Sequence, residues 1–218
     1  MTRALIAIAM LIAYPTAMLI YASSPSLPGG LCVTHGIDGT DTAYYVESDS
    51  ASLRAVAPQT GGDRMLLTFT ARGEASPPVP LADGKIRHQV CAKLRAADGC
   101  NLVYVCWRLE PKPWIQVQVK SNPGKHDATA CGAAGYIQAT PTDLMPVPGY
   151  RDGREHTMDA QLIGTALAVS IDGIPAWEGE VDQAATSFDG PVGIRTDNER
   201  ITATLRADVD CTSVVGGE

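Results

Sequence analysis

Phenylalanine is scarce in this chain of 218 residues, with only two copies, and aromatic residues together make up 6%. Basic residues are outnumbered, because 17 Lys and Arg stand against 24 Asp and Glu, which gives a formal net charge of −7. The chain has no cluster of Lys or Arg to contact phosphates, so nucleic acid is excluded as the expected partner. Hydrophobic residues still reach 45%, too many for a disordered chain, and a folded domain with a buried core is expected.

Several motifs of catalysis and metal binding are also missing. Gly-x-Ser-x-Gly and phosphate-binding loops are absent, as are Asn-x-Ser/Thr glycosylation sites. The four histidines show neither His-x-His nor His-Glu-x-x-His spacing: His35, His88, His126 and His156. We therefore expect no metal and no cofactor. Calcium stays open as an alternative to a plain turn at Asp38 and Asp41, whose segment offers carboxylates and carbonyl groups.

Residues 1–22 contain the one long apolar run, preceded by a single Arg. As a helix the run would span about 28 Å, close to the hydrocarbon thickness of a bilayer. It predicts an N-terminal apolar helix that is either a cleaved signal peptide or a membrane anchor, and both alternatives stay open. Residues 23–30 (SSPSLPGG) are typical of a linker, residues 31–211 of a domain, and residues 212–218 of a tail. The domain is expected outside the cytoplasm: secreted, periplasmic or membrane-anchored.

All six cysteines follow the apolar run, which favours disulfides in an oxidising compartment. Two predicted strands, Lys85–Leu94 and Asn101–Leu109, flank the turn signal Asp98-Gly99. An antiparallel pairing about that turn places Cys91 directly opposite Cys106. This register predicts a disulfide between the two cysteines.

The remaining cysteines allow a less direct argument. Cys32 and Cys211 bracket the domain, and a disulfide between them would fasten its ends. Cys100 and Cys131 are then left as the third pair. A metal–thiolate site is the alternative, and the absence of a Cys-x-x-Cys motif disfavours it.

Alternation of apolar and polar residues, rather than a helical period, dominates the chain after residue 30. The predicted strands, besides the two named above, are 65–71, 114–120, 156–162, 167–171, 176–181, 190–196 and 200–209. Pro77–Pro80 and Pro141–Gly149 are predicted to be long connections between strands. Short strands separated by tight turns predict an all-β fold, an antiparallel β-sandwich of two stacked sheets.

Three segments carry a resemblance to a known superfamily: Gly153–Thr157 (GREHT), Leu167–Gly173 (LAVSIDG) and Gly190–Asn198 (GPVGIRTDN). Over residues 150–209 the chain resembles the concanavalin A-like lectin/glucanase superfamily, which includes laminin-G-like and keto-disaccharide-hydrolase-like domains. The resemblance implies a jelly-roll sandwich. It leaves the activity open, because the superfamily holds lectins, adhesion modules and hydrolases.

The resemblance also implies where a ligand would bind, since such domains often hold sugars on a concave sheet. A sugar site needs an aromatic plane beside amides and charges that bond hydroxyl groups. One predicted strand offers Trp114, Gln116 and Gln118 on its outer face, and its neighbour offers Tyr104 and Arg108. The alternative is an ordinary polar face with Trp114 packed under a loop. The leading hypothesis is an extracytoplasmic, non-catalytic module that binds a glycan or another cell-surface ligand, and an uncleaved N-terminal segment would add a membrane contact.

Glycosidase chemistry needs two carboxylates across a cleft. The Glu-x-Asp-x-Glu pattern that the resemblance implies for glucanases is absent. The nearest match is Glu178, Glu180 and Asp182, which would share one face of a predicted charged edge strand. A glycoside-active hydrolase is therefore the second hypothesis, and a purely structural envelope or adhesion component the third. We interpret Arg195–Asn198 as a segment that specifies a turn.

Overall fold

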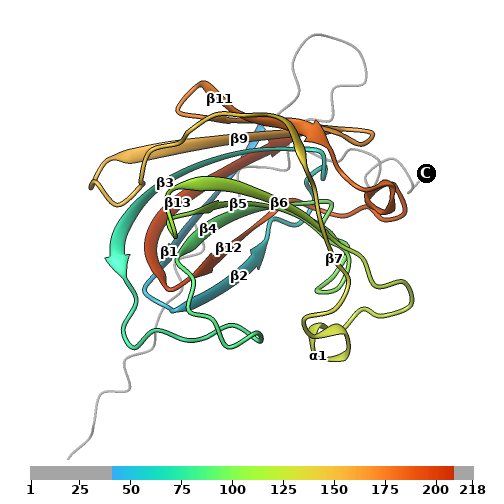
Figure 1. Cartoon of the computed structure of the whole chain (residues 1–218), viewed down its shortest axis with the longest axis horizontal. Helices are drawn as coiled ribbons and strands as arrows, with labels where there is room; N and C mark the ends of the chain where they lie inside the picture. Colours follow the sequence, from blue (N-terminus) through green and yellow to red (C-terminus); the bar gives the residue numbers. More distant parts are fainter. Residues whose placement is uncertain (1–40, 209–218) are drawn as a thin grey trace, which may run out of the picture.

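The computed structural model describes residues 41–208, which form two antiparallel sheets (Figure 1). The seven-stranded sheet contains, in spatial order, β1 (Asp41–Ser48), β13 (Glu199–Asp208), β3 (Arg64–Glu74), β9 (Glu155–Ile163), β10 (Ala166–Ile171), β11 (Ile174–Glu180) and β8 (Pro141–Leu144). The six-stranded sheet contains β2 (Ser52–Val56), β12 (Gly193–Asp197), β4 (Gln89–Leu94), β5 (Leu102–Arg108), β6 (Trp114–Lys120) and β7 (Tyr136–Gln138). The predicted all-β, antiparallel two-sheet fold is confirmed for this part of the chain.

Apolar side chains from both sheets meet in one core, because alternate residues of each strand point inward. Phe69 on β3 and Trp107 on β5 lie edge to face, with ring centroids 5.8 Å apart. Tyr150 packs against both rings and is fully buried. Burying a side chain of this size contributes about 2–3 kcal/mol relative to leaving it in water, so these rings hold the sheets together.

Two disulfides link the strands and loops of the six-stranded sheet. Cys91 on β4 lies opposite Cys106 on β5, as the predicted register requires, and the two are bonded with a Cα–Cα distance of 4.0 Å. Cys100 and Cys131 form the second disulfide, with a Cα–Cα distance of 5.9 Å. Both predicted pairings are confirmed, and a metal–thiolate site at these four cysteines is wrong.

The structure corrects several details of the predicted strand pattern, and it adds β1, β2 and β7, which were not predicted. The segment assigned to a long connection contains β8, which pairs with β11 as the edge strand and begins with Pro141. A proline is compatible with an edge because only one side of the strand is paired. β11 lies between β10 and β8, so its predicted place at an edge is wrong. The strand predicted from Lys85 begins only at Gln89.

Several predictions fall on residues outside the described range. These are the N-terminal apolar helix, the linker, the tail, Cys32, Cys211, His35 and Asp38. Within residues 41–208, the structure contains no helix with the length and apolar character needed to cross a membrane.

Two connections extend to the same side of the six-stranded sheet (Figure 1). One is the loop 75–88 between β3 and β4, and the other carries the short helix α1 (Ala128–Cys131) between β6 and β7. The 3-10 helix η1 (Gln183–Thr186) lies between β11 and β12. The two connections make the outer face of this sheet the floor of a hollow.

Candidate functional site

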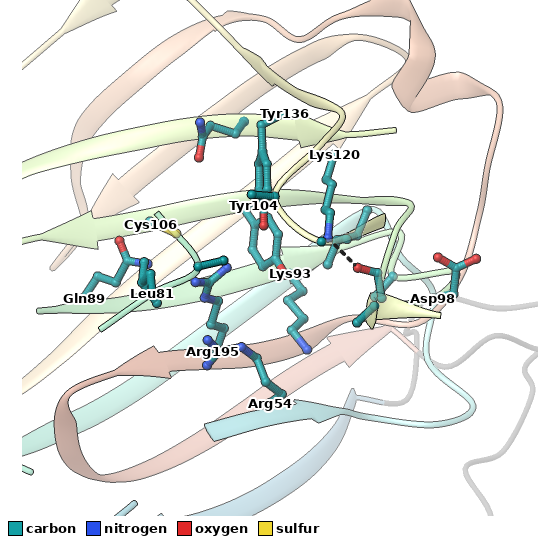
Figure 2. A pocket seen from close by; sticks show the side chains of 18 of the residues that line it. Arg54, Leu81, Gln89, Lys93, Asp98, Tyr104, Cys106, Lys120, Tyr136 and Arg195 are labelled. Atoms are coloured by element: carbon teal, nitrogen blue, oxygen red, sulfur yellow. Dashed lines mark hydrogen bonds between the residues drawn. The ribbon is translucent and has the colours of Figure 1, made fainter. Parts of the chain in front are cut away.

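A pocket of about 670 Å³ lies over the outer face of the six-stranded sheet, and we call it the groove (Figure 2). Strands β2, β12, β4, β5, β6 and β7 supply its floor. Residues 81–87 line one side, and residues 96–99 with the region around α1 line the other. A volume of this size is typical of sites for small ligands.

Strand pairing sets one row of side chains at the centre of the floor. Lys93 on β4 lies opposite Tyr104 on β5, and Tyr104 lies opposite Gln118 on β6. On the other side of Lys93, its partner on β12 is Gly193, which has no side chain. The Lys93 Nζ therefore reaches across to β2, where it donates to the Ala55 carbonyl oxygen at 3.3 Å. A Cβ on Gly193 would lie 2.3 Å from that same oxygen.

A second row brings two guanidinium groups together. Arg54 on β2 and Arg195 on β12 are directly opposite each other, an arrangement that is unfavourable for like charges. The buried carboxylate of Asp197 lies between them and accepts from Arg54 Nη2 at 2.5 Å and from Arg195 Nε at 2.7 Å. Gln89 adds a third donor to Asp197 at 2.6 Å. One carboxylate thus holds both cations in place.

The charges in this part of the floor shift one another's protonation. Burial, followed by the nearby charges of Arg54 and Arg195, lowers the pKa of Lys93 to about 8. Burial alone would raise the pKa of Asp197, but the two guanidinium groups hold it below its usual value. Lys93 is only 7% exposed, so its ammonium group has lost most of its water.

Aromatic rings continue the floor toward α1. Tyr104 and Tyr136 are stacked, with centroids 6.2 Å apart and an interplanar angle of 22°. The guanidinium carbon of Arg195 lies 5.1 Å from the centre of the Tyr104 ring, and Lys120 Nζ lies 5.2 Å from that of Tyr136. Tyr104 is buried, whereas Tyr136 is 36% exposed and is the ring that a ligand can reach.

The wall at residues 79–87 is fixed by one buried side chain, Asn198. Its Oδ1 accepts from the Val79 amide at 2.7 Å, and its Nδ2 donates to the carbonyl oxygens of Val79 and Arg87, each at 3.0 Å. Asn198 has a φ of 58°, which asparagine tolerates better than most residues. The predicted turn at Asp197-Asn198 therefore also holds this wall of the groove in place.

The opposite wall is held by Asp98 and the Cys100–Cys131 disulfide. Asp98 accepts from the amides of Cys100 and Asn101 at 2.7 and 2.9 Å, and it contacts His126 Nδ1 at 2.7 Å. Asp127 caps α1 by accepting from the Thr129 amide. These contacts fix the position of α1 over the sheet.

The structure places the five predicted ligand-binding residues on one sheet face but separates them. Tyr104, Gln116 and Gln118 line the groove, whereas Trp114 and Arg108 do not. Arg108 lies over the Trp114 ring, 5.4 Å from its centre, and also donates to Gln116 Oε1 at 3.1 Å. Gln116 in turn donates to Gln138 at 2.7 Å. Among residues 41–208, the Gln118 side chain forms no hydrogen bond, so its amide is available to a ligand.

Sequence reasoning missed several groove residues, among them Arg54, Lys93, Tyr136 and Arg195. Arg195 was interpreted only as part of a turn segment, yet its side chain lines the groove. The predicted hairpin register that pairs Cys91 with Cys106 also pairs Lys93 with Tyr104, so it could have identified Lys93 as the neighbour of Tyr104 on the same face. Arg54 and Arg195 are far apart in sequence and meet only because β2 pairs with β12.

The acidic residues considered for catalysis lie elsewhere. Glu178 and Glu180 are exposed on β11 of the seven-stranded sheet, and neither lines the groove. The side chain of Asp182 caps η1 by accepting from the Ala184 amide at 2.9 Å. His156, buried in the core, contacts Asp172 at 2.8 Å and a second aspartate at 3.0 Å, which fits a structural role.

Among the described residues, no group of three or more His, Cys, Asp or Glu side chains is arranged to hold a metal ion. Of the two residues considered for calcium, Asp38 lies outside the described range and Asp41 begins β1. Calcium at this segment stays a prediction.

The fold and the groove together define a β-sandwich domain with a ligand-sized, positively charged site on one sheet. No protein-family model and no curated protein matches the sequence. Among solved structures, the chain is similar to the carbohydrate-binding module CBM66 from Bacillus subtilis, with 10% identity over 78% of this chain and 92% of that chain and a TM-score of 0.48. It is also similar to the galectin LEC-6 from Caenorhabditis elegans, with 9% identity over 76% and 94% of the two chains and a TM-score of 0.42. A tetrameric galectin from the ball sponge Cinachyrella sp. shows 12% identity over 78% and 99%, with a TM-score of 0.40.

Proposed function

We propose that the groove binds a saccharide, and that the chain is a non-catalytic glycan-binding module with a concanavalin A-like jelly roll. One observation carries the proposal: Lys93, Tyr104 and Gln118 form a continuous row on the floor of a pocket of ligand size. Among the described residues, Lys93 forms no ion pair and Gln118 no side-chain hydrogen bond. The row therefore offers polar groups that a bound ligand would complete.

The chemistry of the floor fits a sugar. The exposed ring of Tyr136 offers an apolar plane to the C–H face of a pyranose, and it lies opposite Lys120 on the neighbouring strand. The amide of Gln118 can both donate to and accept from hydroxyl groups. A mixture of aromatic surface and amide groups suits a ligand whose ring faces are apolar and whose rim is polar.

The acidic residues of the lining favour binding over hydrolysis. Asp83 forms an ion pair with Arg87 at 2.5 Å, and Asp98 is occupied by the amides and the histidine of its own wall. Both carboxylates thus have structural partners, whereas a glycosidase needs a proton donor and a base or nucleophile facing the scissile bond. This supports a module that holds its ligand without cleaving it.

The proposed location is outside the cytoplasm. Two disulfides within the described residues support an oxidising compartment, since such bonds are rare in the cytosol. The apolar run in residues 1–22 would export the domain or anchor it to a membrane. A glycan of a cell surface or of the surrounding matrix is the proposed partner.

The direct test is a glycan array probed with the full chain, followed by calorimetric titration of the strongest ligand. We expect Gln118→Ala and Tyr136→Ala each to weaken binding about tenfold, the effect of one lost hydrogen bond or ring contact. Gln161→Ala is the matched control, because Gln161 is an exposed glutamine on the other sheet. Absence of any glycan binding, or unchanged affinity in both groove variants, would overturn the proposal. Release of new reducing ends from the bound glycan would overturn its non-catalytic part.

A further inference from the structure

The charges that face the groove do not balance, although the whole chain is acidic. Five basic residues line it: Arg54, Arg87, Lys93, Lys120 and Arg195. Only two acidic residues do so, Asp83 and Asp98, and the first of these is taken up by Arg87. Behind the lining, the carboxylate of Asp197 is buried and pairs with Arg54 and Arg195. The groove is therefore a positive site on a chain with a formal net charge of −7.

The excess of positive charge is concentrated at Lys93. Figure 2 shows its side chain beside those of Arg195 and Arg54, and the charges of both act on it. Asp197 is shared by the two arginines, so three cations have one counter-charge. Within residues 41–208, the hydrogen-bond partner of Lys93 Nζ is a backbone carbonyl group. A buried ammonium group without a counter-ion is costly, and an anion bound from outside would offset that cost.

We propose that the groove recognises an acidic saccharide, whose carboxylate or sulfate group lies against Lys93, Arg54 and Arg195 while its sugar ring lies along Gln118 and Tyr136. This inference rests on the proposed function, because it names the class of saccharide that the same site binds. The cationic cluster and the amide belong to neighbouring positions of the floor, since Lys93 and Gln118 flank Tyr104. One monosaccharide with a charged substituent can therefore contact both.

The surroundings of the cluster select for a sparsely charged ligand. Asp83 and Asp98 stand on the two walls, and the chain as a whole repels anions. Charges farther than about 10 Å apart are largely screened at moderate salt, so a single acidic group inside the groove is attracted locally. A polyanion that extends beyond the groove would meet the acidic remainder of the surface. The site thus favours one acidic sugar over a uniformly charged polymer such as nucleic acid.

The test uses matched ligands on the full chain. Each acidic glycan is offered as the free acid, as its carboxyl-reduced neutral form and as a sulfate ester of that neutral form, with a phosphodiester oligonucleotide as a fourth probe. We expect the acid or the sulfate to bind at least tenfold more tightly than the neutral form, because each charge-assisted hydrogen bond contributes more than a neutral one. The comparison of acid with sulfate shows which anion the groove prefers.

Variants assign the preference to the cluster. Lys93→Met and Arg54→Gln are expected to reduce the ratio of acidic to neutral affinity to about threefold or less, with binding of the neutral form retained. Lys112→Met and Arg64→Gln are the matched controls, since Lys112 is exposed in a loop and Arg64 lies on the other sheet. Thermal unfolding of each variant verifies that it is folded. Lys93 and Arg54 lie on different strands, so if one variant is unstable the other still tests the assignment.

Each outcome decides a separate claim. Equal affinity for acidic and neutral glycans, with Gln118→Ala still weakening both, would overturn the acidic class and leave the proposed function standing. An acidic preference that survives both groove variants would overturn the assignment to Lys93 and Arg54. Oligonucleotide binding as tight as that of the acidic glycan would also overturn the inference. Failure to bind any glycan would overturn the proposed function itself.

Discussion

The outer faces of the two sheets hold charge in different ways. On the seven-stranded sheet, Arg64 pairs with Asp159 at 3.1 Å, and both side chains are partly exposed. On the six-stranded sheet, the carboxylate of Asp197 is 2% exposed and serves two guanidinium groups. Lys93, beside them, has no carboxylate partner among the described residues. The outer face of the seven-stranded sheet thus carries a solvated ion pair, whereas that of the six-stranded sheet contains a buried positive charge without its own counter-charge.

The uncharged side chains on the outer faces of the two sheets also differ. Thr204, Thr68 and Thr157 are aligned across three neighbouring strands of the seven-stranded sheet, and small β-branched residues of this kind suit a solvated strand. The corresponding row of the six-stranded sheet combines a lysine, a tyrosine and a glutamine beneath two walls. Exposed pairs contribute about 0–1 kcal/mol, whereas unbalanced buried charge costs stability. The two faces therefore differ in burial and in charge balance, and the difference is consistent with the proposed ligand site on the six-stranded sheet.

The largest difference between the faces is expected at their carboxylates. Asp197→Ala leaves the buried Arg195 without a counter-charge and removes the ion pair of the more exposed Arg54, and we expect the free energy of unfolding to fall by about 3–5 kcal/mol. Asp159→Ala should cost about 1 kcal/mol or less, because its partner is solvated. Urea unfolding of both variants measures the two values. Equal losses would remove the distinction between the faces.

A smaller loss of stability is expected at Asn198, whose side chain holds one wall of the groove. Asn198→Ala removes three hydrogen bonds to the segment 79–87 and places alanine at a positive φ, so we expect a loss of about 2–3 kcal/mol. Asn198→Gly accepts that φ and isolates the contribution of the hydrogen bonds. Limited proteolysis should cut within the segment 79–87 faster in both variants. Cleavage at the wild-type rate would show that the wall is held by other contacts.

Lys93 predicts a pH dependence with a definite sign. Its pKa is about 8 in the fold against 10.5 for an unperturbed lysine, so between these values the unfolded chain binds more protons than the folded one. The free energy of unfolding therefore rises with pH, by about 2 kcal/mol up to pH 9.5. Lys93→Met should abolish this rise, whereas Lys112→Met should keep it. Measurements stop below pH 10 because burial raises the pKa of the facing Tyr104, which would lower stability above that pH.

The smallest effects are expected for the threonines on the outer face of the seven-stranded sheet. Thr68→Val and Thr204→Val should change the free energy of unfolding by no more than about 0.5 kcal/mol. Glycan affinity should not change, because these side chains lie on the sheet opposite the groove. A loss of binding in either variant would place a ligand site on the wrong face for this interpretation.

Local sequence patterns were sufficient for much of the sandwich. The turn signal at Asp98-Gly99 set the register of β4 and β5, and with it the Cys91–Cys106 disulfide. Alternation also placed Tyr104 and Gln118 on one outer face. β8 escaped prediction because it is short and begins with a proline, a residue that locally indicates a loop.

The cationic cluster could not be predicted in the same way. Arg54 and Arg195 belong to strands that pair only after most of the chain has been placed, so no window of sequence contains both. Their significance depends on their shared partner, the buried Asp197, and this sharing is a property of the assembled sheet. Trp114 is the opposite case, since it was predicted from the sequence and lies on the same outer face but outside the lining of the groove.

The positions of the two described disulfides connect folding with recognition. Cys106 lines the groove and is bonded to Cys91 on the neighbouring strand, and Cys100–Cys131 ties α1 to the turn that precedes β5. Both cross-links thus belong to the part of the domain that would touch a sugar. Formation of these disulfides in an oxidising compartment would then have two effects. It would stabilise the domain, and it would complete the shape of the groove after synthesis.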